Sequence, residues 1–232
     1  MGIQHIGVIM DGNRRWARSN ALELHKGHDK GANTFGHLCD WCMKAGVPYL
    51  TVYAFSTETW NRGGGEVRHL FRLMEKYFVE EKAQCIEKGV RIRIIGDRSR
   101  FDARVLGIID DIEKATANCR NLYVQIALSY GGRDEIVRAA KKIAAEVVDG
   151  RLGIDNIIET VFEKYLDTAG VPDIDLVIRT GGAENLRISN FLLWQTAYSE
   201  LFFSDLLWPD FTHEEFLRAV KYFNSANRKF GK

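Results

Sequence analysis

Near its N-terminus the chain reads His5-Ile6-Gly7-Val8-Ile9-Met10-Asp11-Gly12-Asn13-Arg14-Arg15-Trp16, and this stretch decides the fold. The first half is a short apolar run without polar alternation, which is typical of a strand buried on both faces. The second half is a turn with an acid, an amide and two guanidinium groups. A strand that leads through a polar turn into a helix is the pattern of α/β folds whose ligands bind beyond the strand ends.

The same pattern recurs along the chain. Strand-like runs bounded by turn residues occupy residues 49–55, 90–95, 122–128 and 174–178, and residues 201–203 are a candidate for one more. Helical patterns lie between them at residues 28–45, 66–88, 100–118, 134–148, 154–169 and 213–227. Strands that alternate with helices predict an α/β fold, with a central, mostly parallel sheet flanked by helices.

Length and charge narrow the class of protein. The chain has 232 residues, which suits a single domain over residues 1–232 better than two small ones. With 32 basic and 31 acidic side chains the net charge is +1, so no global field favours nucleic acid as a partner. No apolar run is long enough for an integral membrane segment, and residues 1–10 lack the pattern of a signal peptide. We therefore expect a cytoplasmic protein.

The cysteines offer one competing motif. Cys39 and Cys42 have the spacing of a zinc or redox pair, but no second pair follows, and both lie in a helical pattern. Buried free thiols are therefore the expectation for a chain in a reducing compartment.

The turn after the first strand has the groups that bind phosphate. Backbone N–H groups and the dipole at a helix N-terminus favour an anion there. Arg14 and Arg15 add bidentate charge-assisted hydrogen bonds. Asp11 beside them suits Mg²⁺, which takes one or two carboxylates together with phosphate oxygens. The simpler alternative, in which Asp11 only caps a helix and the arginines are surface charges, stays open on local spacing alone.

Other strand ends have similar chemistry. Residues 55–62 offer hydroxyls, an aromatic wall and an arginine, in Ser56, Thr59, Trp60 and Arg62. A later glycine turn is flanked by the groups of a second diphosphate site, Arg179, Arg187 and Ser189. Residues 129–133 are interpreted more simply as a turn and helix cap.

Two further residues have a structural and a functional interpretation. His28 precedes a helix and is by default a neutral cap, with a phosphate contact as the alternative. Glu200 begins a strand and is by default solvated, unless it acts together with Asp11. Glycine signatures of nucleotide sites and a nucleophile elbow are absent from the sequence. Phosphate-binding turns separated by apolar segments therefore indicate an organic diphosphate.

The motifs together resemble the cis-prenyltransferase family, whose best-known members are the undecaprenyl diphosphate synthases. The resemblance covers nearly the whole chain in family order, at residues 5–13, 15–17, 27–31, 53–56, 60–62, 94–97, 130–133, 175–182, 187–195 and 207–211. It implies an α/β homodimer with a hydrophobic tunnel beside the sheet, Mg²⁺ as cofactor and prenyl diphosphates as substrates.

The resemblance also implies roles for single residues. Asp11 would bind Mg²⁺ and assist loss of the allylic diphosphate, and Glu200 would help through the metal. The candidate catalytic residues are Asp11, Asn13, Ser56 and Thr59. The candidate substrate-binding residues are Gly12, Arg14, Arg15, Trp16, Leu24, His28, Trp60 and Arg62 on the allylic side, and Arg179, Arg187 and Ser189 on the acceptor side.

The chain departs from the family pattern inside both diphosphate sites. Leu24 stands where an arginine is usual, Thr59 where an asparagine is usual and Gly63 where a proline is usual. The segment from Arg179 to Arg187 is two residues longer than is common in the family. These departures suggest a changed reaction. In this the chain resembles a minor branch of the family, the lavandulyl diphosphate synthases, which join two allylic diphosphates head-to-middle.

The hypothesis from the sequence is a short branched product made from dimethylallyl or geranyl diphosphate. The alternatives are an ordinary head-to-tail synthase that uses isopentenyl diphosphate, a non-catalytic subunit, and a general phosphate-binding module.

Overall fold

Six strands form one sheet in the computed structural model, which describes residues 2–61, 64–182 and 185–226. The strand order is β3-β4-β2-β1-β5-β6, and every pair in it is parallel. The strands are β1 His5–Ile9, β2 Tyr49–Ser56, β3 Val90–Ile95, β4 Leu122–Tyr130, β5 Leu176–Arg179 and β6 Glu200–Phe203. The α/β class is confirmed, and residues 201–203 belong to a strand.

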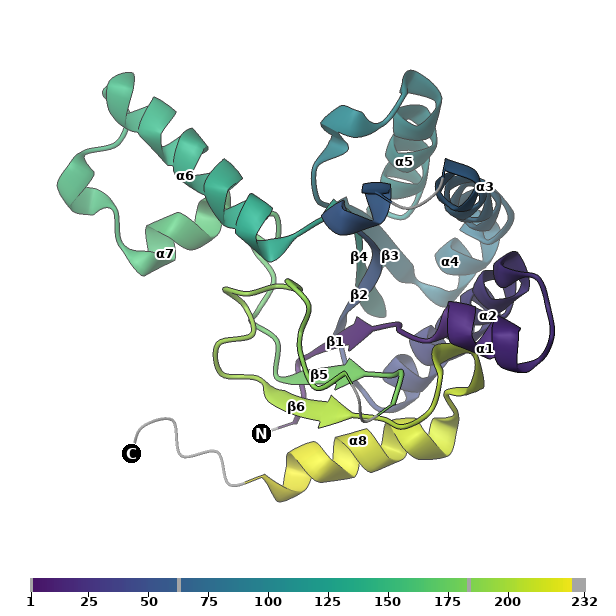
Figure 1. The fold of residues 1–232 in the computed structure, drawn as a ribbon. Helices are drawn as coiled ribbons and strands as arrows, with labels where there is room; N and C mark the ends of the chain where they lie inside the picture. The colour runs from purple at the N-terminus through teal and green to yellow at the C-terminus, as the bar shows by residue number, and fades with distance from the viewer. Residues whose placement is uncertain (1, 62–63, 183–184, 227–232) are drawn as a thin grey trace.

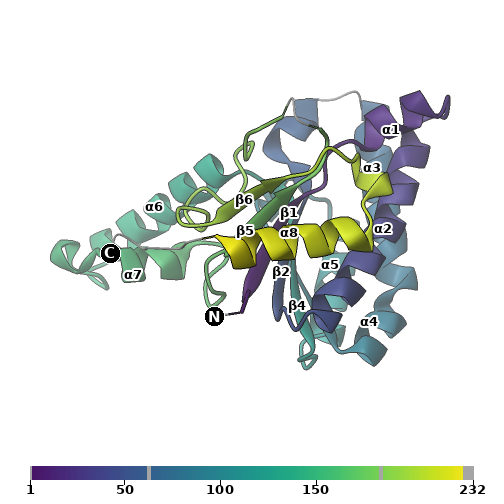
Figure 2. The same ribbon diagram turned by 90° about the horizontal axis from the view of Figure 1, so that it is seen from below.

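Helices cover the sheet unevenly. The α-helices are α1 Asn13–Ser19, α2 Leu24–Lys44, α3 Gly64–Glu80, α4 Lys82–Lys88, α5 Ala103–Ala115, α6 Gly132–Val148, α7 Glu159–Phe162 and α8 His213–Ser225. Figures 1 and 2 show α6 and α7 extending as an arm away from α1 to α5. No helix within the described part of the chain is both long and apolar enough to cross a bilayer.

The strand β1 shows why its sequence is apolar throughout. Successive side chains of a strand point to opposite faces. Val8 belongs to the larger core, where α2, α3, α5 and α8 pack against one face. Ile9 belongs to a smaller core on the other face, together with Phe191 and Leu192. Both faces are buried, so no position in the strand favours a solvated side chain.

Two helix predictions need correction. The helix expected at 66–88 is divided at Glu81 into α3 and α4. The helix expected at 154–169 is wrong, because that segment holds only the four-residue α7 between short 3-10 turns. Leu166 is extended there, and the next residue, Asp167, donates its backbone N–H to Glu135 at 2.9 Å. Tertiary hydrogen bonds override the local helical preference.

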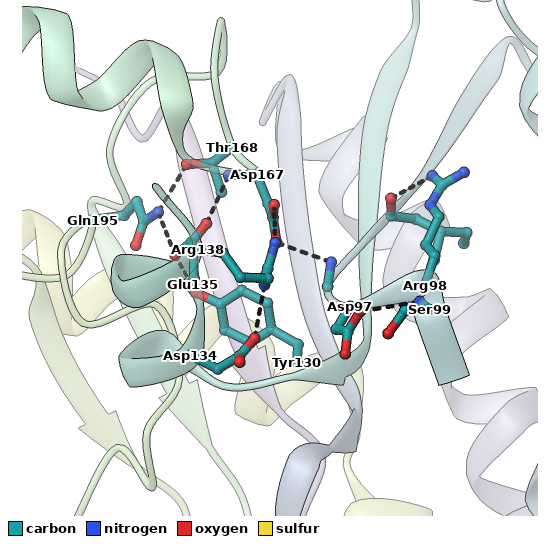
Figure 3. A network of polar contacts seen from close by, with 12 residues as sticks. Asp97, Arg98, Ser99, Tyr130, Asp134, Glu135, Arg138, Asp167, Thr168 and Gln195 are labelled. Atoms are coloured by element: carbon teal, nitrogen blue, oxygen red, sulfur yellow. Dashed lines mark hydrogen bonds and ion pairs between the residues drawn. The ribbon is translucent and has the colours of Figure 1, made fainter. Parts of the chain in front are cut away.

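A buried polar network fixes the start of α6 (Figure 3). Tyr130 donates its hydroxyl to the Glu135 carboxylate at 2.5 Å, and Gln195 donates to the same carboxylate at 3.1 Å. Burial raises the pKa of Glu135, although these hydrogen bonds act in the opposite direction. One turn further on, Arg138 binds both carboxylate oxygens of Asp167 at 2.8 and 2.6 Å. The helix start is therefore held rigidly against the end of β4.

All four cysteines are free thiols. Cys39 and Cys42 are buried inside α2, as expected, and burial raises the pKa of both. Cys85 and Cys119 are only partly buried. The thiolate is the reactive form of cysteine, so Cys39 and Cys42 pack as small apolar residues.

Candidate active site

The polar turns meet at one edge of the sheet. Ile9 of β1 pairs with Tyr53 of β2 on one side and with Arg179 of β5 on the other. Because the strands are parallel and in register, the turns that follow them project from the same edge. Asp11 and Ser56 thereby come to line a common cavity.

This cavity has a volume of about 930 Å³ and two chemically distinct ends. Its polar end contains eleven of the sequence-predicted residues: Asp11, Gly12, Asn13, Arg14, Arg15, His28, Ser56, Thr59, Arg179, Arg187 and Ser189. Its apolar end lies between the sheet, α2 and α3, and is lined by Phe35, Val52, Phe55, Leu70, Phe71, Met74, Tyr77, Phe78, Ile126 and Leu128. The arrangement fits an amphipathic ligand with an anionic head and an apolar chain.

Arg179 joins the two halves of the polar end. It is only 5% exposed. Its Nη2 donates to Asp11 Oδ2 at 2.9 Å, and its Nη1 donates to the Ser189 hydroxyl at 2.7 Å. Nη1 also donates to the carbonyl of Arg187. The turn after β1 and the loop after β5 are thus held together by one guanidinium group, whose charge is balanced by Asp11.

Asp11 is also the residue best placed to hold a metal ion. Arg15 Nη2 lies 3.3 Å from Asp11 Oδ1, and about a third of the Asp11 side chain is exposed at the cavity. The described residues contain no group of three or more His, Cys, Asp or Glu side chains that could hold a metal ion by themselves. Mg²⁺ commonly binds through one or two carboxylates and substrate phosphates, so a single carboxylate beside cationic phosphate ligands fits it.

Two glycines allow α2 to approach α1 closely. A Cβ on Gly27 would lie 2.0 Å from the carbonyl oxygen of Asn13, and a Cβ on Gly31 would lie 2.3 Å from Asn13 Oδ1. These contacts leave no room for a side chain. The glycines on either side of His28 therefore seat the helix that carries this histidine against the start of α1.

Ser56 and Thr59 form a hydroxyl pair in the cavity wall. Their oxygens are 3.0 Å apart, and Thr59 is 5% exposed. The residues lie at the end of β2 and in the following 3-10 turn, Thr57–Asn61. Ser56 directly follows Phe55, which pairs with Leu128 of β4, so the hydroxyl pair lies where the polar turn follows the apolar strands of the cavity wall.

Glu58 and Asn190 are among the polar lining residues that sequence reasoning missed. Desolvation alone would raise the pKa of Glu58, but hydrogen bonds from its own N–H and from Ser56, Asn190 and Thr57 lower it overall. Glu58 is thus an anion in a mainly cationic wall. Its position directly after two hydroxyl residues at a strand end was the available signal.

The two predicted tryptophans support the site from outside the cavity lining. Trp16 donates its indole N–H to Asp210 at 2.7 Å. Trp60 donates to the Ser129 hydroxyl at 2.9 Å and packs against Phe55 with ring centroids 5.0 Å apart. Leu24, the first residue of α2, is not among the described lining residues. Trp16 and Trp60 are likewise not among the described lining residues, although Trp60 packs against two residues that are, Phe55 and Phe71.

Glu200 lies at the other edge of the sheet. It pairs with Leu176 of β5, which pairs with Ile6 of β1, so Glu200 is level with the beginning of β1. Asp11 lies about 16 Å further along the strand direction, at 3.3 Å per residue. One chain therefore does not bring Asp11 and Glu200 to a common metal. Arg62 lies outside the described residues.

The fold and the cavity define a class of enzyme that binds amphipathic diphosphates at the carboxyl edge of a parallel sheet. A model of the family described as "Putative undecaprenyl diphosphate synthase" matches residues 9–231. The chain belongs to this family, the cis-prenyltransferases, and is a transferase of prenyl groups.

Individual relatives agree with this assignment. An isoprenyl transferase from Aquifex aeolicus is 44% identical over 99% of this chain and 96% of its own length. Lavandulyl diphosphate synthase from Lavandula x intermedia, solved in complex with dimethylallyl diphosphate, is 34% identical with a TM-score of 0.95, over 99% of this chain and 98% of its own. A probable undecaprenyl diphosphate synthase from Campylobacter jejuni is 37% identical with a TM-score of 0.83, over the full length of both chains.

Proposed function

We propose that the enzyme joins an allylic diphosphate, dimethylallyl or geranyl, to a second allylic C5 diphosphate in a head-to-middle condensation. The observation that carries this proposal is the Ser56–Thr59 hydroxyl pair. It occupies the junction between the polar and apolar ends, where the reacting carbons of two bound substrates would meet. The backbone similarity to lavandulyl diphosphate synthase supports it.

When the bond between the donor carbon and its diphosphate breaks, positive charge develops on the carbon and negative charge on the diphosphate, and both need stabilisation. The bond between C1 of the donor and its diphosphate oxygen breaks, and C1 bonds to C2 of the acceptor double bond. The resulting cation at C3 then loses a proton from a methyl group. Arg15 and His28 would bind the leaving diphosphate, and Arg187 and Ser189 would bind the diphosphate of the acceptor. Preorganised cations stabilise the charge that develops on the leaving group.

Mg²⁺ bound by Asp11 would supply further neutralisation of the leaving diphosphate. Arg179 would hold Asp11 in place through its hydrogen bond at 2.9 Å. The apolar wall around Phe55 and Leu128 would exclude water from the cation. A metal shared by Asp11 and Glu200 would need the two side chains from different copies of the chain, which fits the homodimer that the family resemblance implies.

The second candidate is head-to-tail condensation with isopentenyl diphosphate. It is favoured by the 44% identity to an isoprenyl transferase, which exceeds the 34% identity to lavandulyl diphosphate synthase. The same cavity would serve, with proton loss from C2 of the acceptor. The two candidates differ in the acceptor and in the carbon skeleton of the product.

Product analysis by mass spectrometry separates them. The purified chain is incubated with Mg²⁺ and with dimethylallyl diphosphate alone, with dimethylallyl and geranyl diphosphates, or with isopentenyl and geranyl diphosphates. The proposal expects condensation in the first two mixtures. Product in the third mixture alone would replace the proposal by head-to-tail synthesis.

A further inference from the structure

Asn190 connects three separate elements beside the cavity. Its carbonyl accepts a hydrogen bond from the N–H of Gly132 at 2.7 Å, and its Oδ1 accepts one from the N–H of Arg133 at 2.9 Å. Both donors lie in the first turn of α6. Its Nδ2 donates to Glu58 Oε1 at 3.2 Å, in the turn that also carries Thr59.

The orientation of the Asn190 amide follows from its partners. A backbone N–H can only donate and an ionised carboxylate can only accept, so Oδ1 must face Arg133 and Nδ2 must face Glu58. The backbone of Asn190 has φ of +65°, a conformation that asparagine adopts more readily than most residues. Both features favour asparagine at this position.

The elements that Asn190 joins carry opposite halves of the proposed site. Ser189 directly precedes it, and Arg187 lies in the same loop. On the other side, Glu58 lies next to Thr59 of the hydroxyl pair. Glu58 and Asn190 line both the main cavity and a smaller one of about 190 Å³. The bond between them therefore lies directly at the site.

The third partner, α6, supplies a rigid anchor. Its first turn is fixed by the network of Tyr130, Glu135 and Gln195 in Figure 3. Gln195 belongs to the same loop as Asn190, so this loop is tied to α6 at two points. The contact is also tight, because a Cβ on Gly131 would lie 2.7 Å from Asn190 Nδ2.

We infer that Asn190 is a positioning residue that fixes the acceptor-diphosphate loop, residues 187–189, relative to the Ser56–Thr59 hydroxyl pair through its hydrogen bond to Glu58. The inference rests on the proposed condensation of two diphosphates. Asn190 holds the loop that binds the acceptor and takes no part in the bond changes. Loss of the Glu58 bond therefore weakens productive binding of the acceptor more than that of the donor.

Asn190→Asp tests this with little change in shape. The variant keeps an acceptor for Arg133 and tolerates the same backbone conformation, but it places a carboxylate oxygen against Glu58. We expect kcat/KM for the C5 acceptor to fall about tenfold, with KM for geranyl diphosphate nearly unchanged, because the lost bond is charge-assisted but partly solvated. Asn118→Asp, which makes the same change at an exposed asparagine that is not among the described lining residues, is the matched control and retains wild-type kinetics.

A double variant that combines Asn190→Asp with Glu58→Gln provides the rescue. The introduced glutamine amide can donate to the introduced aspartate, which restores the bond with its polarity reversed, so kcat/KM returns to within about threefold of wild type. If Asn190→Asp does not fold, Asn190→Gly keeps the positive φ and removes the bond to Glu58 together with the one from Arg133, with an expected loss at least as large.

Three results would overturn the inference. They are unchanged acceptor kinetics in Asn190→Asp, equal changes in both KM values, and a double variant no better than the single one. If the wild-type enzyme is active and the variants give any of these results, only the positioning role of Asn190 is overturned. A wild-type chain that condenses no pair of prenyl diphosphates overturns the proposed function and this inference together.

Discussion

The two ends of the cavity are built in different ways. At the polar end the central groups are held by directed bonds: Arg179 has three partners, and Asp11 lies between two guanidinium groups. At the apolar end the wall consists of side chains such as Phe71 and Met74, held by packing alone. Directed bonds tolerate little change, whereas packed walls accept substitutions of similar volume. The reaction should therefore depend on the polar end and the choice of prenyl chain on the apolar end.

The largest effect is expected at Asp11. Asp11→Ala leaves Arg179 without its ionic partner and removes the carboxylate that fits Mg²⁺. We expect kcat to fall roughly 1,000-fold or more, the scale of losing a main electrostatic contact to the transition state. Turnover with saturating Mg²⁺ is the measurement, and circular dichroism checks the fold. Loss of less than tenfold in a folded variant would contradict the role of Asp11.

A change far from both ends should alter stability without altering the reaction. His5 bonds the Pro172 carbonyl at 2.7 Å and the Thr51 hydroxyl at 2.8 Å, and burial lowers its pKa to about 4. Between pH 6.5, near the pKa of histidine in the unfolded chain, and pH 4, the unfolded chain binds a proton at His5 that the folded chain does not bind. Stability therefore falls as the pH drops through this window, by about 3 kcal/mol at most.

The check is denaturant unfolding of wild type and His5→Gln between pH 7 and pH 4. The variant should show a shallower loss of stability over this range and the same products as wild type at pH 7. A parallel pH dependence in both proteins would show that His5 does not titrate as a buried neutral group.

Substitution at the junction of the two ends should change the choice of acceptor. Thr59→Asn introduces the residue usual in the family at this position. We expect the ratio of isopentenyl to dimethylallyl incorporation to rise about tenfold, which corresponds to about 1.4 kcal/mol between two transition states. Thr59→Ser, which retains the hydroxyl, is the control. An unchanged ratio in Thr59→Asn would show that residue 59 does not determine which acceptor the enzyme uses.

The smallest effect on rate is expected at the apolar end. Met74→Ala enlarges the cavity beside α3 and leaves the residues proposed to bind the diphosphates unchanged. Turnover with geranyl diphosphate should therefore stay within about threefold of wild type. Use of the longer farnesyl diphosphate should increase relative to geranyl. Met74→Leu conserves volume and should change neither. A large loss of turnover in Met74→Ala would mean that the two ends are not separable.

The sheet was predictable because burial on both faces leaves its mark on each strand. The apolar run at the start of the chain is β1 almost to the residue, and the candidate at 201–203 is β6. The helix prediction for residues 154–169 failed because the conformation of this segment depends on the hydrogen bond from Asp167 to Glu135 in a distant helix. Helical periodicity in a short segment does not contain that information.

The site was predictable where chemistry follows a strand end. Asp11, Ser56 and Arg179 all line the cavity for this reason. Glu58 and Asn190 were missed because their bond joins residues far apart in the chain. The partnership of Asp11 with Glu200 was expected from the family resemblance, and strand register places the two at opposite edges of the sheet within one chain.

The identity of the incorporated C5 unit distinguishes head-to-middle from head-to-tail condensation. Geranyl diphosphate and Mg²⁺ are supplied with equal concentrations of deuterium-labelled dimethylallyl diphosphate and unlabelled isopentenyl diphosphate, and the products are analysed by mass spectrometry. Head-to-middle condensation predicts a branched C15 product in which a labelled C5 unit is attached to the geranyl chain through C2, whereas head-to-tail elongation gives only linear products. Products that contain only the unlabelled isopentenyl unit would contradict it and show that the cavity performs head-to-tail chain elongation.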